Sequence, residues 1–329
     1  MGSRDEQHPN NRGFDLFYGM KAGGRDYFYN EKKSDRPGDE RNLLLNDRQV
    51  KFEKYLTDAF SEKAVEFINE SSQPFMMYLA YNAVHTPMQA TDEDMAKFEG
   101  HPRQKLAAMT YALDRGVGTV IRGLKDSGKF DNTLIFFLSD NGGATTNQSS
   151  NYPLKGFKGN KFEGGHRVPY FVVWKNGIPA GKPYDGLVSS LDIFATAIDA
   201  ASISKTRNRL DGVSLLPYLK GKKGEPHKVL YWRKMDTRAI RSGDYKLIIT
   251  HGVDSVLYNI RRDPEEMNNL INKEPDLYRK LAKKLAKWEK NECIEPSWLE
   301  EGWRKITNRY HQQLMHNEIK TAQDLYKKK

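Results

Sequence analysis

The sequence predicts an α/β fold in which a mostly parallel sheet lies between helices, followed by a small C-terminal subdomain. Between about residues 56 and 201, short apolar runs alternate with helical patterns, and this alternation is typical of parallel sheets covered by helices. After about residue 220, short strands separated by turn residues predict a small antiparallel sheet with a helix. We therefore predict two parts, an α/β domain over residues 1–220 and a subdomain with a basic tail over residues 221–329.

The first elements follow in order along the chain. Residues 1–50 are rich in Gly, Asn, Asp and Arg with scattered aromatic residues, and they predict long irregular loops. Apolar residues at helical spacing predict a helix over 56–71, and the continuous apolar run "PFMMYLAYN" (74–82) predicts a strand buried on both faces. The same pair recurs as a predicted helix over 106–128 and a predicted strand "NTLIFFLSD" at 132–140.

Further elements complete the pattern. The run "VPYFVVW" (168–174) predicts a third strand after a glycine-rich loop, and 187–201 predicts another helix. Short strands are expected within 229–260, at "VLYW", "RAIRSGDYKLIIT" and "VLYNI". A last helix is expected from about Pro275, because its apolar residues form one stripe: Leu277, Leu281, Leu285 and Trp288.

Composition and charge exclude several classes of protein. The chain has 329 residues, with 53 Lys and Arg against 43 Asp and Glu, a formal charge of +10 and a pI near 9.3. That balance would suit a polyanion such as nucleic acid or a sulfated polysaccharide, although a solvated surface rich in lysine accounts for it more simply. The sequence has no nucleic-acid-binding motif and no membrane-spanning run, so we expect neither partner. The single cysteine, Cys293, excludes an internal disulfide and a Cys-based zinc site.

Polar residues at the ends of the predicted strands are the candidates for chemistry. Asp140 and Asn141 directly follow a predicted strand, and ligands bind at the carboxyl ends of strands in parallel sheets. A carboxylate and an amide oxygen are hard donors that suit Ca²⁺ or Mg²⁺ better than zinc. Gly142 and Gly143 let the backbone turn away without blocking the site. The alternative is an Asp-Asn-Gly turn that only ends the strand.

A histidine and a basic loop extend this candidate site. His85 follows the run at 74–82, with Pro87 fixing the turn, so we expect its imidazole at the same sheet edge as Asp140. The loop "PLKGFKGNKFEGGHRVP" (153–169) carries four cations that could bind an anion: Lys155, Lys158, Lys161 and Arg167. The alternatives are an incidental histidine and a flexible surface loop.

Three segments together resemble a known family. "PFMMYLAYNAVHTP", "LDRGVGTVIRGLKDSGKFDNTLIFFLSDNGG" and "KGNKFEGGHRVP", in this order and spacing, closely resemble the second half of type I, formylglycine-dependent sulfatases of the alkaline-phosphatase-like superfamily. The resemblance extends to "HPNNRGFDLFYG", "LDGVSLLPYLKG", "RAIRSGDYKLI" and "LYNIRRDPEEMNNL". It therefore covers nearly all of the chain to about residue 300.

The resemblance implies a function and a role for each matched residue. It implies an arylsulfatase-like sulfuric ester hydrolase, in which Asp140 and Asn141 are ligands of Ca²⁺, with Mg²⁺ second. His85 would contact the sulfate oxygens or help protonate the leaving group, and Lys158 would bind the sulfate. A sulfate ester carries negative charge that a divalent ion and lysines stabilise and a histidine can neutralise. A sulfated carbohydrate is the expected substrate, and the family implies a periplasmic or secreted protein, although the sequence has no signal peptide.

The sequence also departs from the family pattern. The family's formylglycine comes from a Cys/Ser-x-Pro/Ala-x-Arg motif, which this sequence lacks, and Cys293 in "ECIEPSW" does not fit it. Two further metal-binding aspartates of the family are not matched. The start, "MGSRDEQHPN", falls at the end of another family motif, so we expect that about the first third of the domain is missing and that Met1 is internal or a late start.

Two interpretations follow from this departure. In one, the chain is the C-terminal two thirds of a sulfatase and hydrolyses sulfate esters only with a complementing N-terminal segment, a further candidate partner. In the other, it is an inactive relic that binds sulfated glycans or other polyanions. Calcium discriminates between them, because a module that only binds glycans should not be stabilised by Ca²⁺.

Overall fold

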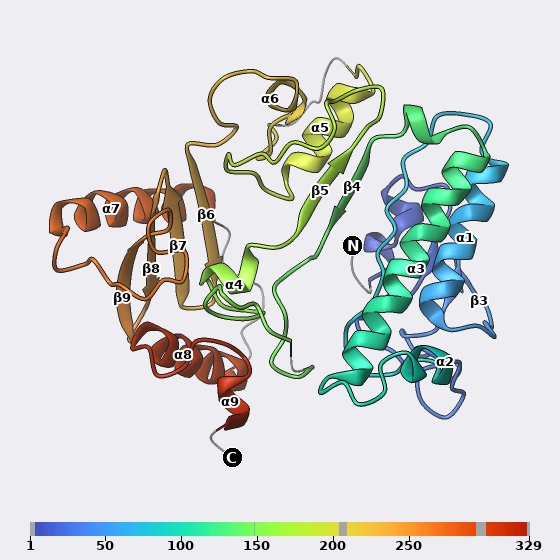
Figure 1. The fold of residues 1–329 in the computed structure, drawn as a ribbon, viewed down its shortest axis with the longest axis horizontal. Coiled ribbons are helices and arrows are strands. Elements are labelled where there is room, and N and C mark those ends of the chain that lie inside the picture. Colours follow the sequence, from blue (N-terminus) through green and yellow to red (C-terminus); the bar gives the residue numbers. More distant parts are fainter. Residues whose placement is uncertain (1–3, 148, 204–208, 294–300, 328–329) are drawn as a thin grey trace. The chain divides into compact units, whose positions relative to one another are not determined.

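The computed structural model describes residues 4–147, 149–203, 209–293 and 301–327, which belong to two compact units (Figure 1). The units are Met1–Asp131 and Asn132–Lys329, and each is described by itself. The boundary predicted at residue 220 lies inside the second unit, a few residues before its four-stranded sheet begins at Val229.

The first unit opens with the long loops that the sequence predicts. Its short elements are η1 (Asp5–Gln7), η2 (Pro9–Arg12), β1 (Tyr18–Gly19), β2 (Leu44–Leu45) and β3 (Arg48–Gln49), and the three strands pair antiparallel in the order β1-β2-β3. The loops are held by buried contacts instead of by regular structure. The guanidinium of Arg25 lies 2.7 Å from the carboxylate of Asp35, and both side chains are almost fully buried. Tyr27 and Leu43 are also buried, in the apolar core of this unit.

Two helices form the rest of the first unit and confirm the predicted helical patterns. They are α1 (Leu56–Glu70) and α3 (Gln104–Asp126), with the short α2 (Asp92–Ala96) between them in the chain. α1 and α3 pack side by side (Figure 1). Glycine permits this close approach, because a Cβ at Gly116 would lie 2.5 Å from Ser61 Oγ, and one at Gly123 would lie 2.9 Å from a methyl carbon of Val65.

The strand predicted at 74–82 is not confirmed. This segment is not assigned to a strand, and no ladder partner lies beside it among the described residues. Its exposure alternates along the chain, with Met76 59% and Tyr78 64% exposed. A continuous apolar run favours a strand buried on both faces, but a strand also needs a hydrogen-bonded neighbour, and Met76 and Tyr78 are exposed.

The second unit begins with a two-stranded ladder. Its first elements are η3 (Phe130–Asn132), which starts in the preceding unit, β4 (Ile135–Leu138), α4 (Glu163–His166), β5 (Tyr170–Val173), α5 (Asp192–Ala200) and α6 (Leu216–Leu219). β4, β5 and α5 confirm the predicted elements at these positions. β4 and β5 pair antiparallel, with Phe137 opposite Phe171, so the parallel pairing that we expected is not found among the described residues.

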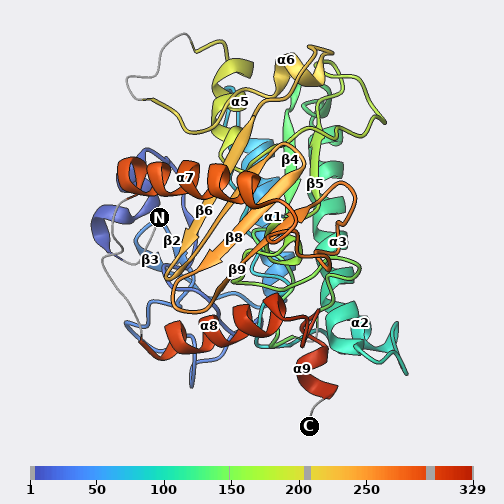
Figure 2. The ribbon, with the colours of Figure 1, turned by 90° about the vertical axis from the view of Figure 1, so that its left-hand side faces the viewer.

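The C-terminal part confirms the predicted antiparallel sheet and helix. The strands are β6 (Val229–Lys234), β7 (Thr237–Ser242), β8 (Tyr245–Thr250) and β9 (Asp254–Asn259), paired in that order, and the helix is α7 (Pro275–Glu292). Figure 2 shows α7 lying across the sheet. Leu281 and Leu285 of α7 pack on Ile240 and Leu247, which point to the same face of the sheet.

The opposite face of the sheet is covered by the end of the chain and by the glycine-rich loop. Residues 301–315 form a helix, α8 (Glu301–Met315), where we expected only a basic tail, and α9 (Asp324–Lys327) follows. Leu314 of α8, Ile248 of β8 and Phe157 and Phe162 of the loop share one core. Among the described residues, no helix has both the length and the apolar character needed to cross a membrane.

The packing of α7 generates a first prediction. Leu285 is fully buried between α7 and the sheet, so Leu285→Ala leaves a cavity and should lower the free energy of unfolding by about 2 to 5 kcal/mol. Urea unfolding followed by circular dichroism measures the change. The neighbouring Lys284 is exposed, and Lys284→Ala should change stability by less than about 0.5 kcal/mol. Equal losses in the two variants would contradict this packing.

Candidate functional site

The turn after β4, which contains Gly142 and Gly143, packs with its backbone against the backbone of α4. Gly142 N–H donates to Gly165 O at 3.1 Å, and a Cβ at Gly142 would lie only 1.8 Å from Gly164 O. A Cβ at Gly143 would lie 2.3 Å from Ser149 Cβ. The two glycines are therefore required by close packing, which is a stronger constraint than the turn geometry that the sequence suggested.

The same turn binds the backbone of Lys158. Lys158 N–H donates to Gly143 O at 3.0 Å, and Gly143 N–H donates to Asn151 Oδ1 at 2.8 Å. The backbone of Lys158 is thus bound to Gly143, which follows Asn141 by two residues in the chain. Asp140, Asn141 and Lys158 belong to the second unit, and His85 belongs to the first.

The side chains of Asp140 and Asn141 are not used by the fold. Neither side chain has a hydrogen bond or an ion pair among the described residues, and Asp140 is exposed. One carboxylate and one amide oxygen are therefore free, which fits a hard divalent cation such as Ca²⁺. In the described part of the chain, no three His, Cys, Asp or Glu side chains are grouped to hold a metal ion. These two residues can thus supply only part of a calcium site.

A buried ionic cluster anchors the loop that carries Lys158. Lys246 Nζ of β8 lies 2.8 Å from Glu163 Oε1 and 3.0 Å from Glu266 Oε1, and all three side chains are buried. Glu163 N–H also donates to Glu266 Oε2 at 2.6 Å. One ammonium group therefore ties α4 both to the sheet and to the turn after β9.

The pKa values of the two carboxylates in this cluster are shifted in opposite directions. Burial opposes the ionisation of Glu163, but the nearby Lys246 and other cations outweigh burial and lower the pKa of Glu163. Burial is the main effect at Glu266 and, together with the charge of Glu163, raises the pKa of Glu266 in spite of Lys246. Because the single ammonium group of Lys246 faces two carboxylates, Glu266 is the easier of the two to protonate.

Two of the four loop cations have partners within the protein, and for the buried Lys155 this corrects the expectation that it could bind an anion. Lys155 is fully buried, and its ammonium donates to Glu266 O at 3.0 Å and to Asn317 Oδ1. Arg167 lies 3.6 Å from Glu163 Oε2. The sequence could not reveal these partners, because Glu266 and Asn317 lie more than a hundred residues away. Lys158, which is exposed, and Lys161 remain.

Two residues outside the loop approach it and were not singled out from the sequence. Lys234, at the end of β6, lies so close to Gly159 that a Cβ there would be 2.9 Å from Lys234 Nζ. His311 of α8 is fully buried, and the ammonium groups of Lys161 and Lys234 help to lower its pKa. Two basic residues, Arg233 and Lys234, that end the predicted strand after the apolar run "VLYW" were the available signal for Lys234, and His311 had none.

His85 belongs to the first unit, on a loop fixed by Tyr27. The Tyr27 hydroxyl hydrogen-bonds to Asn82 O at 2.7 Å and to His85 O at 2.9 Å, and the ring of Tyr27 is buried. His85 Nδ1 lies 2.8 Å from Thr86 O, so Nδ1 carries a hydrogen and donates it. His85 is exposed, and its Nε2 is left with a lone pair in the neutral ring and a proton in the charged ring.

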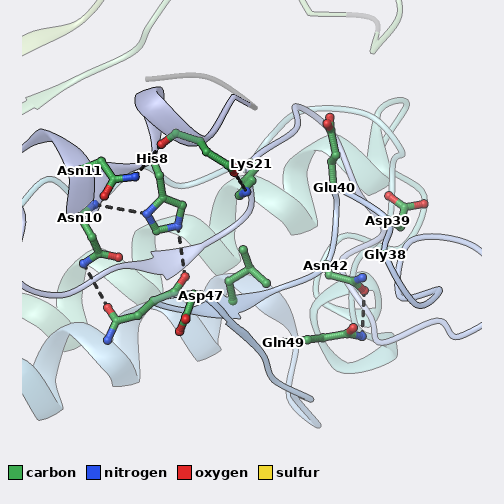
Figure 3. A pocket seen from close by; sticks show the side chains of 13 residues that line it. His8, Asn10, Asn11, Lys21, Gly38, Asp39, Glu40, Asn42, Asp47 and Gln49 are labelled. Carbon is green, nitrogen blue, oxygen red and sulfur yellow. Dashed lines mark hydrogen bonds and ion pairs between the residues drawn. The ribbon is translucent and has the colours of Figure 1, made fainter.

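A polar pocket of the first unit is a different kind of site (Figure 3). It has a volume of about 880 Å³, and its acidic lining residues are Asp5, Asp39, Glu40 and Asp47. Its other polar groups bind one another: His8 Nε2 lies 3.1 Å from Asn46 O, and Gln49 Nε2 donates to Asn42 Oδ1 at 3.0 Å. A lining with four acidic residues does not suit an anion.

Sequence comparisons identify the relatives of this chain. The sequence model of the Sulfatase family matches residues 1–203, and a model of the C-terminal region of N-sulphoglucosamine sulphohydrolase matches residues 158–291. The "uncharacterized sulfatase YdeN" of Escherichia coli is 38% identical over 240 residues, which cover 70% of this chain and 41% of YdeN. Canine N-acetylgalactosamine-6-sulfatase is 29% identical over 261 residues, which cover 75% of this chain and 49% of that protein. The chain spans about half the length of the curated relatives it matches.

Solved structures confirm the predicted fold class. Ps i-CgsB in complex with k-i-k-neocarrahexaose has a TM-score of 0.83 and 35% sequence identity, and the match covers 94% of this chain and 74% of that one. The PsFucS1 sulfatase from Pseudoalteromonas sp. has a TM-score of 0.68 at 23% identity, covering 87% of this chain and 68% of that one, and it supports the fold alone.

The ionic cluster generates a second prediction. Lys246→Met leaves two buried carboxylates without their ammonium group, so it should lower the free energy of unfolding by about 3 to 5 kcal/mol. Glu266→Gln should cost much less, because a Gln oxygen can still accept from Glu163 N–H and the burial of one charge is relieved. Urea unfolding of both variants at pH 7 measures the difference. A Lys246→Met protein as stable as the parent would show that the cluster does not anchor the loop.

Proposed function

Since the chain belongs to the sulfatase family, we propose that it forms part of an enzyme that hydrolyses sulfate esters of carbohydrates with Ca²⁺ as its cofactor. One observation supports this proposal: the hydrogen bond from the backbone N–H of Lys158 to Gly143 O joins the loop that carries Lys158 to the turn that carries Asp140 and Asn141, whose side chains are unpaired among the described residues. A lysine on a loop that is joined to the turn of two possible cation ligands suits an oxyanion and a divalent ion bound close together.

Each residue has a role in this proposal. Lys158 binds the sulfate group through its ammonium, and Asp140 and Asn141 hold Ca²⁺, which neutralises charge on the sulfate oxygens. His85 is the proton donor to the ester oxygen that leaves. Because His85 Nδ1–H donates to Thr86 O, the ring is held with Nε2 as the atom that carries the exchangeable proton.

We further propose that the nucleophile comes from a segment outside these 329 residues, because the sequence contains no Cys/Ser-x-Pro/Ala-x-Arg motif. The substrate is a sulfated oligosaccharide, and the neocarrahexaose complex of Ps i-CgsB and the likeness to N-acetylgalactosamine-6-sulfatase support this class. We expect the protein in the periplasm or outside the cell, as its family implies. The missing motif also favours a second candidate, an inactive relic that binds sulfated glycans.

Sulfate release tests the activity. The complete reading frame that encodes this chain should release sulfate from a neocarrahexaose, whereas the 329-residue chain alone should not. Within the complete protein, Lys158→Ala and His85→Ala should each lower kcat/KM by about a hundredfold or more, because they remove stabilisation of charge and proton donation. Ion chromatography of free sulfate measures both.

The control is Lys284→Ala, an exposed lysine on α7, which should keep full activity. If the complete reading frame releases no sulfate but binds the oligosaccharide, the relic is the correct function. If the Lys158→Ala and His85→Ala proteins are as active as the parent, the proposed site is wrong.

Calcium binding tests the metal ligands separately. Ca²⁺ at a hundred times its dissociation constant should stabilise the chain by about 2.7 kcal/mol, seen as a rise in Tm. Asp140→Ala should abolish the rise, whereas Asp185→Ala, an exposed aspartate on another loop, should keep it. The same rise in Asp140→Ala would exclude Asp140 as a ligand.

A further inference from the structure

Three lysines gather around one glycine of the loop without any acidic partner. Lys234 Nζ of β6 sits against Gly159, whose lack of a side chain makes room for it, and Lys158 and Lys161 lie on either side of Gly159 in the chain. None of the three ammonium groups has an ion pair or hydrogen bond in the part of the chain that the structure describes. The two cations at the ends of the loop differ, because Lys155 has a carbonyl partner and Arg167 has a carboxylate partner.

The pKa values of two of these lysines are lowered. Burial, together with the ammonium groups of Lys234 and Lys246, lowers the pKa of Lys161 to about 8. Burial and the charge of Lys158 lower the pKa of Lys234. Partly buried cations without partners are unfavourable, and proteins keep such groups mainly where a ligand supplies the opposite charge.

The surroundings fix these lysines in place. His166 Nε2–H donates to Lys161 O at 3.1 Å, and the His166 ring stacks on Trp232 of β6 at 4.6 Å between centroids. The backbone of Lys161 is therefore held against the strand that carries Lys234. The cluster belongs to the folded loop and sheet and does not depend on freely moving surface lysines.

Two buried polar atoms beside the lysines also lack partners. His311 is fully buried, its Nδ1–H donates to Thr307 O at 2.8 Å, and its Nε2 has no partner among the described residues. Asn160, between the loop lysines, is 3% exposed, and its Nδ2 is likewise without a partner among them. An unsatisfied buried donor such as Asn160 Nδ2 is costly unless a ligand or water accepts from it.

We propose that Lys161 and Lys234, together with Asn160, bind a second sulfate group of the saccharide, next to the sulfate ester that Lys158 holds. This inference rests on the proposed function, which assigns the first sulfate to Lys158. A sulfate group offers three acceptor oxygens and one negative charge, which match two ammonium groups and an amide donor. The substrate is accordingly a saccharide with at least two sulfate groups on neighbouring positions.

Binding of defined anions tests the site without any need for catalysis. Inorganic sulfate, titrated calorimetrically into the chain in chloride buffer of low ionic strength, should bind the parent protein. Lys161→Met and Lys234→Met should each weaken binding about tenfold, because each removes one charged hydrogen bond. Met keeps the length of the side chain, and Lys284→Met, on the exposed face of α7, is the matched control and should bind like the parent. Unchanged affinity in Lys161→Met and Lys234→Met would overturn the proposal.

Saccharides with one and two sulfates separate this site from that of Lys158. Lys234→Met should weaken the binding of a disulfated disaccharide about tenfold and leave the monosulfated one unchanged, whereas Lys158→Met should weaken both. Equal losses for both saccharides in Lys234→Met would mean that there is no second sulfate position. Failure of the proposed function looks different: the complete protein would release no sulfate, while the preference for the disulfated saccharide would persist.

Discussion

The backbone contact between the turn after β4 and the loop that carries Lys158 is the constraint on which the site depends. Gly142 lies so close to Gly164 that no side chain fits, and the hydrogen bonds of Gly142 and Gly143 connect the turn to that loop at two points. Because these contacts use backbone atoms, Asp140 and Asn141 are free to bind a ligand. The turn thus leaves a carboxylate and an amide unpaired among the described residues, and the loop joined to it carries Lys158, whose ammonium group is also unpaired there.

The cations around this contact are of two kinds, buried cations with partners and less buried cations without them. The cations that fix the loop, Lys155 and Lys246, are fully buried and paired with Glu163, Glu266 or a carbonyl oxygen. The cations near Gly159 are less buried and unpaired in the described structure. A buried pair resists the loss of either partner, whereas an unpaired cation gains from an incoming anion. The anchoring cluster therefore stabilises the loop so that the repelling lysines can remain together.

The sequence predicted the elements that depend on local periodicity. α3 and α7 lie where apolar stripes placed them, and the antiparallel C-terminal sheet lies where turn residues separate short strands. Prediction failed where the outcome depends on distant partners. The run at 74–82 has a strand pattern but no neighbour among the described residues, and Lys155 is buried by contacts with Glu266 and Asn317. Asp140 and Asn141 were found from their place at the end of a predicted strand, the family resemblance singled out Lys158 among the four loop cations, and Lys234 was found only through the structure.

The coupling between calcium and sulfate tests the central claim most directly. If Asp140, Asn141 and Lys158 form one site, Ca²⁺ should tighten the binding of inorganic sulfate to this chain, and sulfate should tighten the binding of Ca²⁺ by the same factor. Calorimetric titration of sulfate with and without saturating Ca²⁺ measures that factor. We expect sulfate to bind at least about fivefold more tightly with Ca²⁺ and the gain to vanish in Asp140→Ala. A sulfate affinity independent of Ca²⁺ would contradict a shared site.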